Sequence, residues 1–392
     1  MDIFMKKVIT FFCSSIWKKS WPLWIGAVGL AFTNIFMFAY ARAIGVFPQM
    51  AMWGSWLYYF MGISVDAPFT QYPRTPVYLD MHSMINFGLI LGVAIAALLA
   101  REFKVRTEDW RGYVAATAGG VLMGFGTVIM PPCNVGCFYS STMALSLSGP
   151  VAAFGLIPGA YVGGLFLKIQ AVKAAADIDF DSLPKGKPAS KKALSHQPML
   201  GVLIILMLAA IALIYAYNGK SKFAGLLFFG ALFGVIFQRS RLCFCSAFRE
   251  IFVSRNGTLM KMVLLSIAIG TVGFSILKSQ GYQTTHFVLP VGLHTIVGAF
   301  IFGVGMVIAG GCGVGILWRS AEGYVRAWIA LIAGMLSSAA WVPVYGGHVG
   351  EGSLYGKPFS LGEQFGWVNG TLIVLMFLAA FYVLILRVEA RK

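Results

Sequence analysis

Apolar runs close to the length of a membrane-spanning helix recur along the whole chain, and this feature restricts the possible folds most strongly. A helix needs about 20 mostly apolar residues to cross the bilayer core. Of the 392 residues, 58% are hydrophobic and 11% are charged, whereas an ordinary soluble domain has about 25% charged residues. The sequence therefore predicts an all-α polytopic membrane protein, and a single signal peptide or anchor does not explain the runs. The predicted spans are about 22–40, 83–100, 112–130, 148–167, 199–217, 223–238, 259–278, 293–310, 327–344 and 367–387.

The positions of the basic residues predict an orientation for these ten spans. Lys and Arg are enriched in loops that stay in the cytoplasm. The basic loops 101–111, 168–192 and 239–255 all fall on that side if both termini are cytoplasmic in an inner membrane. The segment 45–62 is interpreted as interfacial or partly inserted, because an eleventh span would move loop 101–111 outside. Such loops also explain the net charge of +16, so no nucleic-acid partner is expected.

A polar stretch near the midpoint divides the chain. Residues 173–198 contain several Lys, Asp and Pro residues, which predict a solvated cytoplasmic linker. The predicted segments are an N-terminal span with the interfacial piece (1–80), a first repeat half (81–172), the linker (173–198), a second repeat half (199–345) and a C-terminal span (346–392).

Two segments of the chain share an unusual pattern and indicate a duplication. Residues 124–136 read Gly-Phe-Gly-Thr-Val-Ile-Met-Pro-Pro-Cys-Asn-Val-Gly, and residues 303–315 read Gly-Val-Gly-Met-Val-Ile-Ala-Gly-Gly-Cys-Gly-Val-Gly. Seven of the thirteen positions are identical, the cysteine among them. With ten spans, the first copy follows a helix that runs outward and the second follows one that runs inward. We therefore expect an inverted pseudo-two-fold repeat, with a substrate site between broken helices near the bilayer midplane.

The residues before each repeated cysteine predict a break in a helix at membrane depth. Two prolines, 131–132, precede Cys133, and two glycines, 310–311, precede Cys312. Proline removes a backbone donor and glycine weakens a helical turn. Irregular backbone is tolerated at this depth only where it is buried in protein or lines a cavity. Close helix packing alone would explain the other repeated glycines, but packing gives no reason for a cysteine at both breaks.

A third cysteine motif lies at 241–250 and reads Arg-Leu-Cys-Phe-Cys-Ser-Ala-Phe-Arg-Glu. Cys243 and Cys245 would point to different faces of a helix, so only Cys243 is expected on a common path. Arg249 and Glu250 are expected to pair within the bundle, as ionisable residues near membrane depth usually do. The arginines around this motif are interpreted as anchors of a cytoplasmic helix end.

Cysteine suits a path for a small sulphur-containing anion. A thiol is small, polarisable and a weak hydrogen-bond donor, and in apolar surroundings it adds no negative charge against an incoming anion. Helix amino termini after the breaks would supply positive partial charge. The predicted pathway residues are Cys133, Cys312, Cys243, Asn134, Gly136, Gly311, Gly315 and Arg249.

These motifs point to a known family. The Gly-Gly-Cys-Gly-Val-Gly-Ile-Leu-Trp-Arg segment (310–319), the first cysteine segment and the Arg-Leu-Cys-Phe-Cys motif resemble the YeeE/YedE sulphur-transport family over roughly residues 80–345, with a length closer to its YedE-like members. The resemblance implies uptake of thiosulfate through an hourglass-shaped path of re-entrant helices, in which cysteines relay the ion. That role would fall on Cys133 and Cys312, and on Cys243. The resemblance also implies a small cytoplasmic sulphur-carrier protein as a partner.

Two departures from the family pattern leave the substrate open. Pro131 and Pro132 stand where the family commonly has small residues, and Cys137 and Cys245 are additional thiols. Resemblance to longer relatives linked with selenium metabolism makes a selenium species the leading alternative. A membrane thiol redox or sulphur-relay protein is a further alternative, although no Cys-x-x-Cys motif or nearby general base accompanies the thiols. The expected partners are the anion and the lipid bilayer, and no enzyme activity, cofactor or metal site is predicted.

Overall fold

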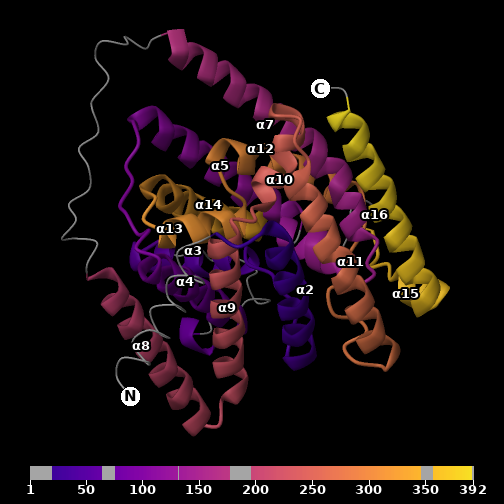
Figure 1. Cartoon of the computed structure of the whole chain (residues 1–392), viewed down its shortest axis with the longest axis horizontal. Helices are drawn as coiled ribbons and strands as arrows, with labels where there is room; N and C mark the ends of the chain where they lie inside the picture. The colour runs from indigo at the N-terminus through magenta and orange to yellow at the C-terminus, as the bar shows by residue number, and fades with distance from the viewer. Residues whose placement is uncertain (1–19, 64–75, 131, 177–195, 346–355, 391–392) are drawn as a thin grey trace, which may run out of the picture.

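The chain forms a bundle of membrane-length helices in the computed structural model, which describes residues 20–63, 76–130, 132–176, 196–345 and 356–390 (Figure 1). Outside the helices, these residues form only isolated β-bridges. Ten segments within the described ranges are long and apolar enough to cross a membrane, which confirms the predicted polytopic α-helical class. Their long helices are α2 (Leu23–Tyr40), α4 (Met81–Leu99), α5 (Trp110–Ile129), α7 (Ser148–Ala176), α8 (Gln197–Tyr217), α9 (Ser221–Ser240), α11 (Thr258–Ser279), α12 (Leu293–Ala309), α14 (Val325–Tyr345) and α16 (Trp367–Glu389).

Shorter helices lie between the long ones and include the segments that follow the breaks. The helix α3 (Pro48–Phe60) has 13 residues and is therefore about 20 Å long, too short for a hydrocarbon core of about 30 Å. This length agrees with the interpretation of 45–62 as a segment that does not cross. The other short elements are η2 (Val77–Leu79), η3 (Asn134–Ser140), α6 (Ser141–Met143), α10 (Phe244–Val253), α13 (Gly313–Ala321) and α15 (Leu361–Phe365).

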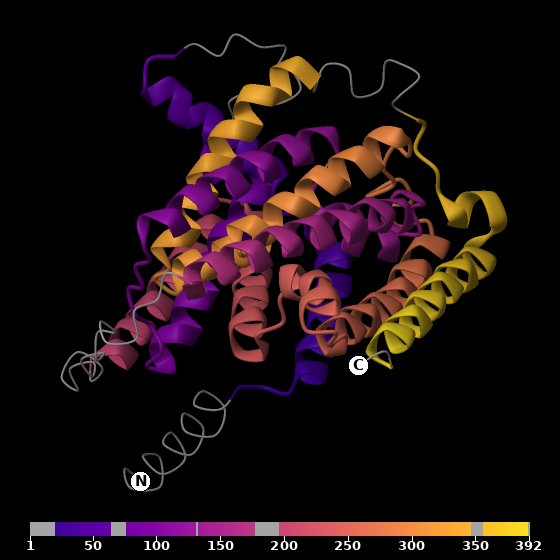
Figure 2. The ribbon, with the colours of Figure 1, turned by 90° about the horizontal axis from the view of Figure 1, so that it is seen from above.

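The helices α5, α7, α12 and α14 form one packed group, and glycines bring their backbones together. Gly119 faces Ala309 and Gly126 faces Phe302, so α5 and α12 run antiparallel. Similar glycine contacts show that α7 runs parallel to α12 and that α14 runs parallel to α5. Figure 2 shows these helices side by side. The opposite directions of α5 and α12 agree with the orientation expected for the two cysteine segments, and the inverted repeat itself stays a prediction.

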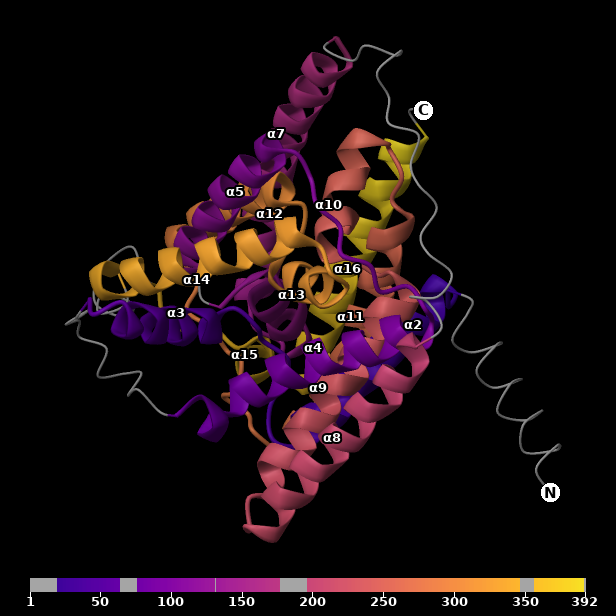
Figure 3. The same ribbon diagram turned by 90° about the vertical axis from the view of Figure 1, so that its left-hand side faces the viewer.

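A second group of helices, α2, α4, α9 and α11, packs beside the first. Gly88 faces Leu227 and Gly234 faces Val93, so α4 and α9 run parallel. The helices α8 and α16 lie at the edge of the bundle (Figure 1), and Gly201 is the buried residue of α8. The short helix α13 contacts α14 from the first group and α4 and α9 from the second, and it lies near the middle of the bundle in Figure 3. The breaks are therefore enclosed between two helix groups.

Two of the predicted features fall where the structure gives no description. Pro131 of the first predicted break and residues 177–195 of the predicted linker lie outside the described residues. The helix α7 extends to Ala176, inside the predicted linker 173–198, and α8 begins at Gln197, near the end of that range. The division into repeat halves and linker therefore stays a prediction.

Candidate functional site

Three of the predicted pathway cysteines each stand at the start of a short buried helix. Cys133, Cys243 and Cys312 are the N-cap residues of η3, α10 and α13, and each has an extended backbone conformation. Their exposed fractions are 0%, 4% and 1%. The residues that end the preceding helices, Arg241 after α9 and Gly310 after α12, have left-handed backbone conformations with φ of 56° and 83°. Each cysteine therefore lies where the chain turns back into a helix inside the bundle.

Gly315 is the point at which two of these cysteines meet. A β-carbon built on Gly315 would lie 3.5 Å from the sulphur of Cys312 and 3.7 Å from the sulphur of Cys243. Gly315 is in the first turn of α13, where backbone N–H groups have no intrahelical acceptor and carry positive partial charge. The space between the two thiols is therefore bordered by an electropositive helix end.

Asn134 is a fully buried polar side chain at the same place. It follows Cys133 as the first residue of η3 and lies beside Cys312. Its amide faces the thiol of Cys312, and neither its nitrogen nor its oxygen has a well-formed hydrogen bond among the described residues. An unpaired buried polar group costs about 1–3 kcal/mol. This amide is therefore available as both a donor and an acceptor for a bound ion.

The other predicted glycines pack against the breaks. A β-carbon on Gly136 would collide with the ring of Pro132, and one on Gly311 would lie 3.1 Å from the backbone carbonyl carbon of Gly315. A side chain at Gly136 would therefore force the Pro132 ring to move, and one at Gly311 would be tightly packed against the first turn of α13. Gly136 and Gly311 therefore hold the breaks compact, whereas Gly315 borders the space between the thiols.

The two additional cysteines have thiols that are already hydrogen-bonded. The thiol of Cys137 donates to the carbonyl of Ser148 at 3.8 Å, and the thiol of Cys245 donates to the carbonyl of Met306 at 3.1 Å. The thiol of Cys245, two positions after Cys243, therefore already has a backbone acceptor. Among the described residues, no group of three His, Cys, Asp or Glu side chains could hold a metal ion.

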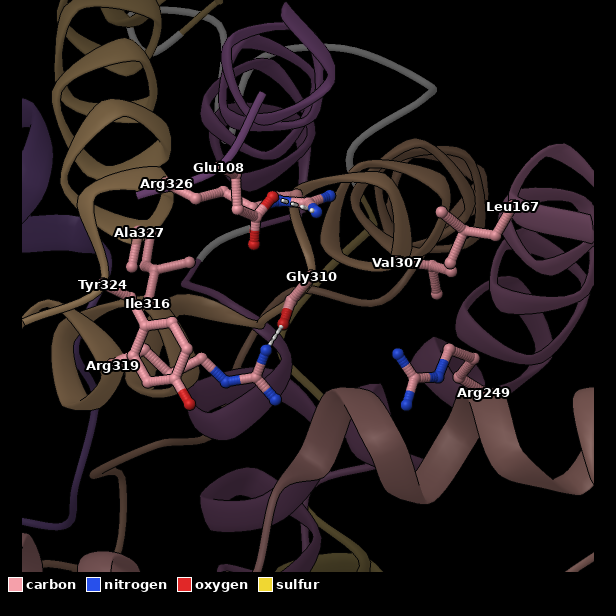
Figure 4. Close-up of a pocket in the computed structure, with 11 residues that line it drawn as sticks. Glu108, Leu167, Arg249, Val307, Gly310, Ile316, Arg319, Tyr324, Arg326 and Ala327 are labelled. Carbon is pink, nitrogen blue, oxygen red and sulfur yellow. Dashed lines mark hydrogen bonds and ion pairs between the residues drawn. The ribbon is translucent and has the colours of Figure 1, made fainter. Parts of the chain in front are cut away.

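A cavity of about 290 Å³ lies beside the second break, where α12 ends and α14 begins. Arg249 from α10, Arg319 from α13 and Arg326 from α14 line it, together with Glu108. Figure 4 shows Arg249 across the cavity from Arg319 and from the Arg326–Glu108 ion pair, whose nitrogen–oxygen distance is 3.0 Å. Arg319 donates a hydrogen bond to the carbonyl of Gly310 in the break. Three guanidinium groups and one carboxylate leave the cavity with an excess of positive charge.

Arg249 was a predicted pathway residue, and it pairs with Glu250 at 3.6 Å as expected. Arg319 was not predicted, although the sequence contained a signal for it. Arg249 follows Cys243 by six positions, and Arg319 follows Cys312 by seven. At 1.5 Å per residue, each short helix therefore carries a cysteine at its start and an arginine about 10 Å further along. Comparison of these two spacings would have identified Arg319.

The arginines before Cys243 form ion pairs that connect separate parts of the bundle. Arg241 pairs with Glu102 at 2.6 Å and with Glu322 at 2.7 Å, and Arg239 pairs with Glu102 at 3.2 Å. Glu322 directly follows α13, and Glu102 lies in the loop after α4. The sequence analysis interpreted these arginines as anchors of a helix end at the membrane surface. In the structure they form ion pairs with glutamates of the same chain. The network ties the end of α9 to the end of α13 and to the loop after α4.

Other basic groups lie near the opposite end of the bundle. Arg42 bonds to the ring of His82 at 3.0 Å, and the buried amino group of Lys278 donates to three backbone carbonyls. Burial, together with the nearby charge of Arg42, lowers the pKa of His286 to about 3. This imidazole is therefore uncharged at neutral pH and adds no charge to that end.

Comparison with known proteins shows extensive similarity to transporters. Residues 5–162 and 239–392 match the model of a family described as sulphur transport. The probable transporter YedE of Salmonella typhimurium is 25% identical over 394 residues, which cover 95% of each chain. Two thiosulfate transporters named TsuA match shorter parts. That of Escherichia coli is 37% identical over 110 residues (28% of this chain, 31% of the relative), and that of Spirochaeta thermophila is 34% identical over 143 residues (36% and 43%).

Proposed function

The chain belongs to the sulphur transport family, and we propose that it takes up thiosulfate along a path formed by Cys133, Cys243 and Cys312. The family and the ten apolar helices make it a multi-pass membrane transporter and not an enzyme. The observation that carries the proposed route is the meeting of two cysteine-capped breaks at Gly315, beside the unpaired amide of Asn134. The proposed substrate is supported by the partial match to two thiosulfate transporters.

The groups at this place match the two ends of a thiosulfate ion. Neutral thiols are polarisable weak donors and suit the soft terminal sulphur. The Asn134 amide and the first-turn N–H groups of α13 suit the charged oxygens. Each contact is weak, so the ion can pass from one thiol to the next without being held tightly. The buried thiols thereby replace part of the hydration shell of the ion.

We place the protein in an inner membrane with both termini and the arginine cavity on the cytoplasmic side, because the basic loops lie at that end. A small cytoplasmic sulphur-carrier protein is the proposed acceptor of the transported sulphur. A selenium species is the alternative substrate.

Growth on thiosulfate as the only sulphur source tests the proposal. A host without its own thiosulfate uptake should grow with the wild-type chain and grow poorly with Cys133→Ala or Cys312→Ala. Removal of one thiol contact worth about 0.5–1.5 kcal/mol should slow uptake of labelled thiosulfate by up to about tenfold. Cys245→Ala is the matched control, because its thiol bonds to a backbone carbonyl, and it should retain wild-type uptake.

Two outcomes would contradict parts of this proposal. Normal uptake by both variants at equal expression would remove the cysteines from the path. Uptake of labelled selenite but not of thiosulfate by the wild-type chain would favour the selenium alternative.

A further inference from the structure

The arginine cavity has features that the thiol path does not explain. Its three arginines come from three different helices, and Glu108 is the carboxylate among the lining residues. Arg249 and Arg326 are only 28% and 24% exposed, so their charges are partly removed from water. Arg249 pairs with Glu250 and Arg326 pairs with Glu108, so three guanidinium groups and two carboxylates leave one positive charge in excess. A bound anion would balance this charge, and the interaction would be stronger here than in bulk water.

We propose that the cavity between Arg249, Arg319 and Arg326 is a second anion-binding site, which receives the divalent sulphur oxyanion after it leaves Cys243 and Cys312. This inference rests on the proposed function for the identity of the ion. The binding itself can be measured without transport.

The two re-entrant helices connect the thiols with this cavity. The helix α10 begins after Cys243 and carries Arg249, and α13 begins after Cys312 and carries Arg319. Arg319 is within electrostatic reach of both of these thiols. An ion that moves about 10 Å along the two helices therefore passes from the neutral thiols to the guanidinium groups.

The chemistry of the lining groups favours an oxyanion. A guanidinium group presents N–H donors in a planar fork that fits two oxygens of a tetrahedral anion, and such charge-assisted bonds are about twice as strong as neutral ones. The Nε atom of Arg326 is buried without a hydrogen-bond partner in the described part of the chain. Tyr324 also lines the cavity. These groups recognise negative charge and oxygen atoms. We therefore expect both sulfate and thiosulfate to bind in this cavity.

Thermal unfolding of the full-length protein in detergent tests this site. Thiosulfate and sulfate, added at constant ionic strength with chloride as the reference salt, should each raise the Tm of the wild-type protein. Cys243→Ala should retain the response to sulfate. Arg249→Gln should weaken apparent sulfate binding by about tenfold to a hundredfold, the effect of one lost hydrogen bond to a charged group. Arg249→Lys should recover part of the response, because the charge remains.

Arg249 is the position for the main test because its ion-pair partner is the adjacent residue Glu250. Its replacement therefore breaks no ion pair between helices. Arg387→Gln is the matched control: it removes the same charge from an exposed position near the end of α16, and its sulfate response should equal that of the wild type. An unchanged sulfate response in Arg249→Gln would overturn the inference, and so would loss of that response in Cys243→Ala. Failure of thiosulfate uptake by the wild-type chain would instead count against the proposed function.

Discussion

Gly315 shows how a single residue can shape the proposed path. The β-carbon that Gly315 lacks would touch the sulphur atoms of Cys312 and Cys243, at ordinary van der Waals distances of 3.5 Å and 3.7 Å. Glycine within a helix is less favourable than alanine by about 0.5–1 kcal/mol. Position 315 therefore has glycine, which stabilises the helix less than alanine does, although an alanine side chain would fit there. The space between the thiols depends on this choice.

We therefore expect Gly315→Ala to separate stability from transport. The added methyl group should raise the free energy of unfolding by up to about 1 kcal/mol. It should also fill the space between the thiols and reduce thiosulfate uptake, and one methyl group at a discriminating position is worth about tenfold or more. Measurements of Tm and of initial uptake rate check the two effects.

Gly29→Ala is the control for this substitution. Its β-carbon would lie 3.4 Å from the side chain of Ile236, a contact between α2 and α9, and its uptake should match that of the wild type. Full uptake by Gly315→Ala at normal expression would show that the ion does not pass between these thiols.

At the scale of helices, the spacing of α5 and α12 controls where the breaks lie. The break before Cys133 follows α5, and the break before Cys312 follows α12. A β-carbon on Gly126 would lie 2.7 Å from the backbone nitrogen of Phe302 and 2.9 Å from the carbonyl oxygen of Gly298. Any side chain at this position must therefore push the two helices apart, and both breaks would move with them.

Gly126→Ala should consequently lower both stability and uptake. Overpacking at a close helix contact costs about 1–3 kcal/mol, which should be visible as a lower Tm of the purified protein. Gly164→Ala is the matched control on α7, because its β-carbon would meet Val253 at an ordinary 3.4 Å. The packing account fails if the two variants have the same Tm.

At the scale of the whole molecule, two series of helices follow the same order. The series α2, α3, α4 and α5 precedes the Cys133 break, and α9, α10, α11 and α12 precede the Cys312 break. This order places Phe47, the N-cap residue of α3, at the position of Cys243, the N-cap residue of α10. Phe47 is fully buried and lies close to Gly313 beside the second break. The order favours a first repeat unit that begins with α2, before the predicted boundary at 81.

The ten-span topology predicts which positions face the same side of the membrane. Two spans lie between the N-terminus and Lys104, and ten lie between the N-terminus and Arg387. An N-terminal tag and cysteines at both positions (Lys104→Cys and Arg387→Cys) should therefore all be inaccessible to external reagents in intact cells. Lys220→Cys, at the turn between α8 and α9, should react with an impermeant maleimide from outside. All four positions can be compared in right-side-out and inside-out vesicles. An N-terminal tag on the opposite side from Lys104→Cys would mean that α3 crosses the membrane.

Local properties of the sequence were sufficient to predict the elements of this protein. The ten predicted spans correspond to the ten membrane-length segments of the structure. The helices α5 and α12 end at Ile129 and Ala309, directly before the predicted breaks. Hydropathy and the backbone effects of proline and glycine act within a few neighbouring residues, so one sequence reveals them. The three cysteine motifs indicated the family for the same reason.

Only the tertiary structure decided which of these residues meet. Cys243 and Cys312 are 69 positions apart in the sequence, yet both touch the space at Gly315. Arg249 and Arg319 likewise come to line one cavity although they belong to different helices. Such contacts depend on which helices pack together and at what distance. Small residues permit many close packings and do not by themselves select one, so the site could be assembled only once the bundle was known.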